Sequence, residues 1–306
     1  MNHPIQGVLP VIHTPFRDDE SIDAEALQRE VDWIYEVGAD GLCAAMVSEI
    51  LRLSPSERFE LIEMLVQMSD NRGPVIASVG AETTRQALEY ARHAQQSGCA
   101  AVMAIPPIST GISDEAAWDY FSTLAREIEL PLIVQDASSY VGKAISTQFF
   151  ARLLNEFGAD KILFKPEAAP IGPLLSELRD QTQGQAQIFD GSGGILLVDC
   201  YRRGIRGTMP GVDLLDAVVL LWRALKDGDD AAAYQLYFPI CAIVALQLQA
   251  GLDGFLAIEK YLLQKRGIFT STRRRMPYQW ELDHETASEL DRLFDHLQSA
   301  ITTTAV

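Results

Sequence analysis

KILFKPEAAP, residues 161–170, is a short apolar run that ends on a lysine and is followed at once by proline and glutamate. Its length and its Ile-Leu-Phe centre are typical of a buried strand. The lysine, Lys165, has two interpretations. It extends its amine to water, as many strand-end lysines do, or it lies in a dehydrated cavity, where a neutral amine attacks carbonyl carbons. The sequence around this run decides between them.

Seven more runs of this kind occur in the first 210 residues, each followed by turn residues. The eight runs are GVLPVI (7–12), GLCAAM (41–46), PVIASV (74–79), AAVMAI (100–105), PLIVQ (131–135), KILFK (161–165), AQIFD (186–190) and RGTMP (206–210). Segments with apolar residues at three- and four-residue spacing lie between them, as at 23–38, 54–69, 83–98 and 114–129. This spacing predicts helices, with Ser54 capping one of them and Gly38 and Gly98 closing two others.

Runs that are apolar throughout are what a parallel sheet covered by helices requires. Eight strand and helix units predict an α/β fold, the (β/α)8 TIM barrel, and a doubly wound sheet is the alternative. No strand signal returns after Gly211, and helices are predicted at 212–226, 229–251, 253–266 and 282–302. We therefore expect a catalytic barrel over residues 1–226 and a C-terminal helical extension over residues 227–306.

Composition excludes several classes of partner. The formal net charge of −17 argues against nucleic acid and anionic membranes, because phosphates would be repelled. The four cysteines are scattered and have no metal-binding or disulfide spacing, which fits a reducing cytoplasm. No signal peptide or membrane span is expected, and the one basic island, 271–279, is interpreted as a solvated loop or a subunit contact.

In a (β/α)8 barrel the active site lies at the carboxyl ends of the strands. This position favours the second interpretation of Lys165, an amine inside a functional cavity. The loop after the second run, residues 46–49, enters the next helix, and backbone N–H groups at such a turn can hold a carboxylate. The turn after the eighth run, GTMPG, would let backbone approach a ligand, although a plain turn explains it equally well.

With these residues the chain resembles the family of dihydrodipicolinate synthase and N-acetylneuraminate lyase, which are Schiff-base-forming lyases. The resemblance covers the whole chain and rests on GVLPVIHTPF (7–16), VSEILRLSPSER (47–58), the lysine of the sixth run, and RRGIRGTMPG (202–211). It implies that Lys165 condenses with the keto group of a 2-oxo acid and that the N–H groups of Val47 and Ser48 hold its carboxylate. It also implies a homo-oligomer, a tetramer or dimer, with no metal and no cofactor.

The chain departs from the familiar members of that family. Gln135 and Asp136 stand where a tyrosine and an asparagine are usual, and an amide cannot carry protons. Met46 and Val47 replace the usual loop hydroxyls, and the arginine that grips a second carboxylate is absent. We therefore do not expect dihydrodipicolinate synthesis. The pattern is similar to the branch that acts on 2-keto-3-deoxy sugar acids, such as L-2-keto-3-deoxyarabonate.

Proton transfer then falls to another group, and Glu167 is the best candidate, since a carboxyl in an apolar pocket has a pKa closer to neutrality. Its alternative role is to cap the next helix. Ser48 could supply the missing hydroxyl, Glu49 is expected to be structural, and the default interpretation of Asp136 is a solvated loop residue. The predicted catalytic residues are Lys165, Glu167, Ser48 and Gln135, and the predicted substrate contacts are Met46, Val47, Ser48, Asp136, Ser192 and Met209.

Three hypotheses follow for the function. The first is a lyase that dehydrates a 2-keto-3-deoxy sugar acid through a lysine imine. The second is a pyruvate-dependent aldolase or a condensation like that of dihydrodipicolinate synthase. The third, from another class, is a barrel without chemistry that only binds a 2-oxo acid.

Overall fold

The computed structural model describes residues 3–109, 111–138 and 144–304. Within it the chain forms two compact units. Unit 1 contains the residues up to Gln6 together with Ser54–Gly191 and Asp199–Gly207, and unit 2 contains Gly7–Leu53, Ser192–Val198 and the residues from Thr208 onward.

Unit 1 is built on parallel strands that pair in the order of the sequence. They are β3 (Val75–Ser78), β4 (Ala101–Ala104), β5 (Leu132–Gln135) and β6 (Ile162–Lys165). Every residue of these four strands is buried, which explains why the runs are apolar throughout. A parallel bridge from Phe164 to Ile188 continues the order toward β7 (Phe189–Asp190).

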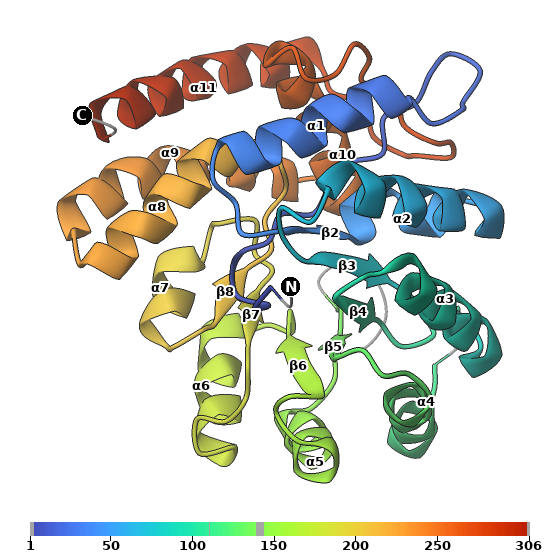
Figure 1. Cartoon of the computed structure of the whole chain (residues 1–306). Helices are drawn as coiled ribbons and strands as arrows, with labels where there is room; N and C mark the ends of the chain where they lie inside the picture. Colours follow the sequence, from blue (N-terminus) through green and yellow to red (C-terminus); the bar gives the residue numbers. More distant parts are fainter. Residues whose placement is uncertain (1–2, 110, 139–143, 305–306) are drawn as a thin grey trace. The chain divides into compact units, whose positions relative to one another are not determined.

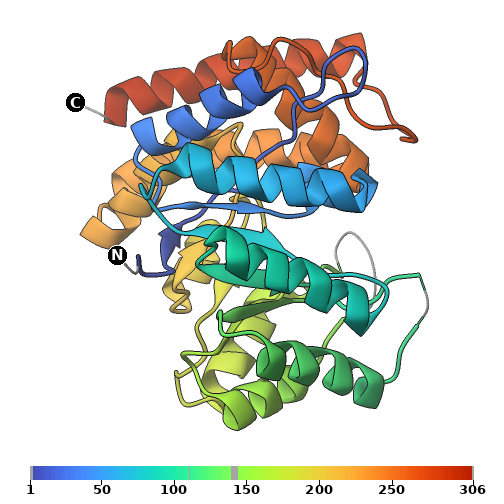
Figure 2. The ribbon, with the colours of Figure 1, turned by 45° about the vertical axis from the view of Figure 1, so that its right-hand side comes forward.

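Helices follow the strands of unit 1, and those at the predicted segments 54–69, 83–98 and 114–129 begin within one residue of them. The helices are α2 (Pro55–Ser69), α3 (Thr84–Ser97), α4 (Asp114–Glu127), α5 (Thr147–Phe157) and α6 (Ile171–Gln181), and consecutive helices contact one another along the sheet (Figure 2). Ser54 accepts a hydrogen bond from the Glu57 backbone N–H while the Glu57 side chain accepts one from the Ser54 N–H, so the predicted cap is a complete capping box.

Unit 2 contains the chain's first two strands, β1 (Gly7–Val8) and β2 (Leu42–Ala44). Val11, just beyond β1, forms parallel bridges both to Cys43 of β2 and to Gly211, which follows β8 (Gly207–Thr208). The first strand run therefore lies between the second and the eighth. Helix α1 (Ala24–Glu36) connects β1 to β2, and α7 (Leu197–Arg202) precedes β8.

Four long helices complete unit 2. They are α8 (Leu215–Asp227), α9 (Asp230–Leu248), α10 (Gly251–Lys265) and α11 (His284–Thr304). Helix α9 contacts the other three, and Figure 1 shows it beside α8 and α11. Within the described residues, α9 is also the one helix long and apolar enough to cross a membrane, a criterion that core helices of soluble proteins meet as well.

The strand order identifies the fold class. Strands three to seven follow one another in unit 1, and the first strand pairs with the second and the eighth in unit 2. A strand order that returns from the eighth strand to the first is that of the (β/α)8 barrel, so the predicted fold class is confirmed and the doubly wound alternative is wrong. The division at residues 226 and 227 stays a prediction.

Candidate functional site

Lys165 is the last residue of β6 and pairs in register with Gln135, the last residue of β5. It is only 4% exposed, because β5 lies on one side of its strand and the Ile188 bridge on the other. The interpretation of Lys165 as a solvated strand-end lysine is therefore wrong for this structure. Its amine is instead held inside unit 1, where water is largely excluded.

Glu167 lies beside this amine. Its Oε1 atom is 3.4 Å from Lys165 Nζ, and its Oε2 atom accepts a hydrogen bond from Gln135 Nε2 at 2.9 Å. Burial raises the pKa of Glu167, and Lys165 and Gln135 oppose that rise. The alternative role as a helix cap is wrong, since α6 begins after Pro170 and has no side-chain cap.

Gly191, the first residue after β7, has no side chain and so leaves space for Lys165 and Glu167. A Cβ atom on Gly191 would lie 2.5 Å from Lys165 Cε and 2.4 Å from Glu167 Oε1, closer than any packed carbon approaches. Gly191 was not among the residues predicted from the sequence. A glycine directly after a barrel strand, on the edge where the other runs end, was the only available signal.

Asp136 is buried, unlike the solvated loop residue that the sequence suggested. It is 1% exposed and its Oδ1 atom accepts hydrogen bonds from the backbone N–H groups of Ser138 and Glu167, so it is not a solvated loop residue. A carboxylate loses its hydration when backbone donors take the place of water. The side chain thus connects the turn after β5 to the turn after β6.

Together these residues form a candidate active site in unit 1. The Lys165 amine, the Glu167 carboxyl and the Gln135 amide converge in a buried place. This arrangement suits attack of the amine on a carbonyl carbon, followed by proton transfer through the carboxyl. Among the residues that the structure describes, no group of three His, Cys, Asp or Glu side chains is arranged to hold a metal ion.

The predicted loop residues Met46, Val47 and Ser48 form a buried 3-10 turn in unit 2. The Ser48 hydroxyl donates to the Ile12 carbonyl at 2.5 Å and accepts from the Ala45 N–H at 3.0 Å. The Ser48 N–H donates to the Ala45 carbonyl at 3.1 Å. The donors of Ser48 are therefore engaged within the protein, and a ligand would have to compete for them.

Two further predicted contacts belong to unit 2. Met209 is buried just after β8. Ser192 is half-buried, and its hydroxyl accepts a hydrogen bond from the Leu196 N–H at 3.1 Å. The roles of both residues as substrate contacts stay predictions.

Unit 2 holds a second buried lysine that the sequence analysis did not select. Lys260 Nζ donates to the carbonyls of Thr14 and Arg273, each at 2.8 Å, and to Glu49 Oε1. Burial lowers the pKa of Lys260 and Glu49 opposes that change, and with all three hydrogens engaged the amine is a poor nucleophile. Glu49 also accepts the Arg275 N–H, so the structural role expected for Glu49 is confirmed.

A cluster of acidic groups surrounds His13 in the same unit. Its Nδ1 and Nε2 atoms donate to Glu30 at 3.1 Å and to Glu259 at 2.7 Å, and these carboxylates raise the pKa of His13 to about 10 against the effect of burial. Asp213 lies beside Glu259, where burial and the neighbouring carboxylate raise its pKa to about 7. Nothing in the local sequence indicated this cluster.

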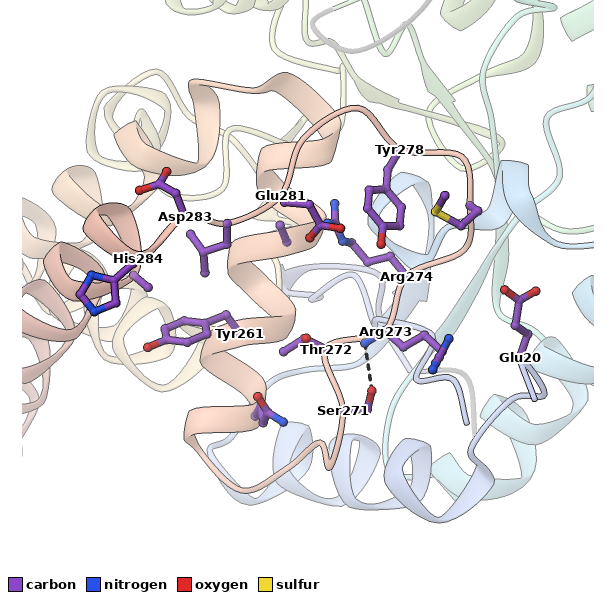
Figure 3. Close-up of a pocket in the computed structure, with 15 residues that line it drawn as sticks. Glu20, Tyr261, Ser271, Thr272, Arg273, Arg274, Tyr278, Glu281, Asp283 and His284 are labelled. Atoms are coloured by element: carbon purple, nitrogen blue, oxygen red, sulfur yellow. Dashed lines mark hydrogen bonds and ion pairs between the residues drawn. The ribbon is translucent and has the colours of Figure 1, made fainter. Parts of the chain in front are cut away.

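Most of the basic island is exposed, as expected of a solvated loop, but Arg274 within it is buried. The island lines a cavity of about 670 Å³ in unit 2, together with α10 and the start of α11 (Figure 3). Arg274 is buried there, stacks on Tyr278 and forms an ion pair with Glu281. Both basic and acidic side chains line this cavity, so its lining selects no charge of ligand.

Comparison with known proteins agrees with this geometry. The model of the dihydrodipicolinate synthetase family matches residues 4–297. The L-2-keto-3-deoxyarabonate dehydratase of Azospirillum brasilense is 30% identical over 93% of this chain and 92% of its own. The 4-hydroxy-tetrahydrodipicolinate synthase of Acidobacterium capsulatum is 28% identical over 89% and 93%.

Solved structures show the same fold. The 4-hydroxy-tetrahydrodipicolinate synthase of Methylacidiphilum fumariolicum superposes with a TM-score of 0.89 at 23% identity, covering 99% of each chain. The chain is thus a (β/α)8-barrel lyase. It belongs to the dihydrodipicolinate synthetase family, whose members act on small 2-oxo acids and are commonly oligomers.

Proposed function

We propose that this protein dehydrates a 2-keto-3-deoxy sugar acid through a Schiff base on Lys165. The observation that carries the proposal is the buried pair of Lys165 and Glu167, 3.4 Å apart, with Gln135 holding the far oxygen of the carboxyl. This arrangement leaves Glu167 Oε1, which accepts no hydrogen bond from the described residues, facing the amine.

The chemistry follows from that geometry. The Lys165 amine attacks the keto carbon, C2, and loss of water gives a protonated imine. The imine withdraws electrons, so Glu167 can remove a proton from C3 as an enamine forms. Glu167 then returns this proton to the C4 hydroxyl, which leaves as water when the C4–O bond breaks. Burial raises the pKa of Glu167, which makes its protonated form more accessible and suits a group that takes up a proton and then gives it back.

The amide of Gln135 supports dehydration over the chemistry of the synthases. It donates to Glu167 and carries no transferable proton, so Glu167 is the proton-transfer group near the amine. The similarity to L-2-keto-3-deoxyarabonate dehydratase favours a five-carbon sugar acid. The family resemblance implies that the N–H groups of Val47 and Ser48 hold the substrate carboxylate, and Met46, Ser192 and Met209 are further predicted contacts. A cytoplasmic homo-oligomer is part of the same proposal.

The imine can be tested by trapping. Sodium borohydride with pyruvate is expected to add one reduced adduct per chain, and peptide mapping is expected to locate it at Lys165. Lys165→Arg should give no adduct, while Lys161→Arg, just before the first residue of the same strand, should give the full adduct. An unmodified wild-type mass under conditions that trap a known family member would refute the proposal.

Product analysis separates dehydration from the alternatives. Dehydration keeps every carbon of the sugar acid in one product, whereas aldol cleavage releases pyruvate, which lactate dehydrogenase detects. We expect loss of one water from 2-keto-3-deoxyarabonate and no pyruvate. Pyruvate release would indicate an aldolase, and calorimetric binding without turnover of any sugar acid would indicate a binding protein.

A further inference from the structure

The turns after β5 and β6 are joined through one carboxylate oxygen. Asp136 Oδ1 accepts the backbone N–H of Glu167 at 3.0 Å. The same atom accepts the N–H and the hydroxyl of Ser138, each at 3.2 Å. Burial raises the pKa of Asp136, and these three donated hydrogen bonds oppose that rise because they favour the ionised carboxylate. The bond to Glu167 fixes the backbone of the residue whose side chain faces Lys165.

Glu167 is therefore held at two points. Asp136 fixes its backbone, and Gln135 fixes the far oxygen of its side chain. Ala137, between Ser138 and Asp136, has φ of +48°, in the left-handed region that non-glycine residues rarely adopt. The bond from the Ser138 N–H to Asp136 stabilises this turn, as is common for aspartate.

We propose that Asp136 is a positioning residue, which sets the place of Glu167 beside Lys165 by holding the backbone of Glu167. This role rests on the proposed function only where it concerns turnover. The negative charge of Asp136 also favours the step in which Glu167 holds the proton taken from C3, and the protonated carboxyl is the form that donates to a leaving hydroxyl. A positioning role accounts for a buried aspartate whose hydrogen bonds go to backbone and to a loop serine rather than toward the amine.

The groups that face Glu167 come from three strands. Lys165 on β6 lowers the pKa of Glu167, and Gln135 at the end of β5 lowers it by donating a hydrogen bond. Asp136 raises it by charge repulsion, in the same direction as burial. On the β7 side, Gly191 approaches Glu167 with backbone and no side chain. Among these neighbours, Asp136 is the one carboxylate that opposes ionisation.

Two substitutions separate the charge of Asp136 from its hydrogen bonds. Asp136→Asn keeps an oxygen that can accept from Glu167 and Ser138. The new amide nitrogen replaces Oδ2, which accepts no hydrogen bond in the described structure. Asp136→Ala removes both charge and acceptor. Ser138→Ala is the matched control, because it keeps the Asp136 charge, the backbone N–H of residue 138 and the bond to Glu167.

The first measurement is the pH profile of kcat/KM. Asp136→Asn should shift the acid limb of the profile, where Glu167 must be ionised to remove the C3 proton, downward by about one pH unit or more, the size expected for loss of one close like charge. Asp136→Ala should lower kcat about tenfold or more with little change in KM, because Glu167 is no longer fixed. Ser138→Ala should keep the wild-type profile. Coincident profiles for wild type and Asp136→Asn would overturn the proposal.

The second measurement does not depend on turnover. Infrared difference spectra of the resting enzyme, with Glu167→Gln to assign the carboxyl band, report the protonation of Glu167 directly. A lower midpoint in Asp136→Asn supports the positioning role even if no sugar acid is converted, in which case only the proposed function fails. An unchanged midpoint in an enzyme that does turn over overturns the positioning role alone.

Discussion

Replacing Asp213 by asparagine is expected to remove much of the pH dependence of folding stability. Asp213 is buried in unit 2, accepts a hydrogen bond from Gln247 at 2.8 Å, and shares the space beside Gly211 with Glu259. Ionising both carboxylates there places two like charges in a medium of low dielectric constant. The asparagine side chain would keep the shape of the protonated aspartate without being able to acquire its charge.

The magnitude follows from the pKa of Asp213, which is raised from 3.8 to about 7. The folded state keeps this proton at pH values where the unfolded chain has lost it, so stability falls as the pH rises from the unfolded pKa through the folded one. Between about pH 5 and about pH 8 the loss from this group is on the order of 3 kcal/mol. The variant lacks that loss.

His13 also makes stability fall as the pH rises, and it does so in the wild type and in the Asp213→Asn variant alike. Its pKa is raised from 6.5 to about 10, so its stabilising effect is complete below the unfolded value and is lost as the pH rises through the folded one. Comparing the wild type with Asp213→Asn at both pH values removes most of this shared contribution. The remaining double difference reports Asp213.

The assay is urea unfolding followed by circular dichroism at about pH 5 and about pH 8, at one protein concentration. The variant should gain stability over the wild type as the pH rises. Asp295→Asn, an exposed change on α11, serves as the control and should leave the wild-type slope in place. Equal slopes in the wild type and Asp213→Asn would refute the reasoning about the buried pair.

Three further substitutions give distinct outcomes. Gly191→Ala should lower kcat at least about tenfold with unchanged circular dichroism, because its methyl group would lie 2.5 Å from Lys165 Cε. Lys260→Met should lower the free energy of unfolding by about 3–5 kcal/mol, since Glu49 would stay buried without its cation, while borohydride still adds one adduct. Phe238→Glu should lower the mass found by sedimentation velocity if α9 forms a subunit contact, because Phe238 is 65% exposed on a helix that has no charge after its first residue.

The first two predictions have a control variant, and each of the three has a result that would argue against it. Gly111→Ala, where an added methyl meets no atom within 4 Å, should keep full activity, and equal activity of Gly191→Ala would argue against the tight site. Lys226→Met, at an exposed position, should not change stability, and a similarly small effect at Lys260 would argue against a buried ion pair. An unchanged sedimentation coefficient for Phe238→Glu would place any subunit contact elsewhere.

The sequence predicted features that depend on neighbours along the chain. The capping box of Ser54 and Glu57 forms within four residues, and the strands from β3 to β6 follow from runs that are apolar throughout. The position of Lys165 at the carboxyl end of a barrel strand also followed, because the repeated strand and helix pattern identifies which edge each run ends on.

Other features were decided by contacts between distant residues. The Ser48 hydroxyl is engaged by Ile12, 36 residues away, and nothing in the loop sequence separates that state from a free hydroxyl. Folding likewise brings His13 to Glu259, 246 residues further along the chain. Local periodicity reports which face of an element is buried, whereas hydrogen-bond partners and the pKa of a buried group depend on which elements meet.

The sequence by itself therefore determined the fold class and the identity of the candidate nucleophile. Only the tertiary structure decided that Gln135 holds Glu167, that Gly191 leaves room for both Lys165 and Glu167, and that Asp136 bonds to backbone. The physical reason is that a repeated pattern of apolar residues is sufficient to specify parallel strands. The environment of one amine depends on single atoms contributed by three different strand ends.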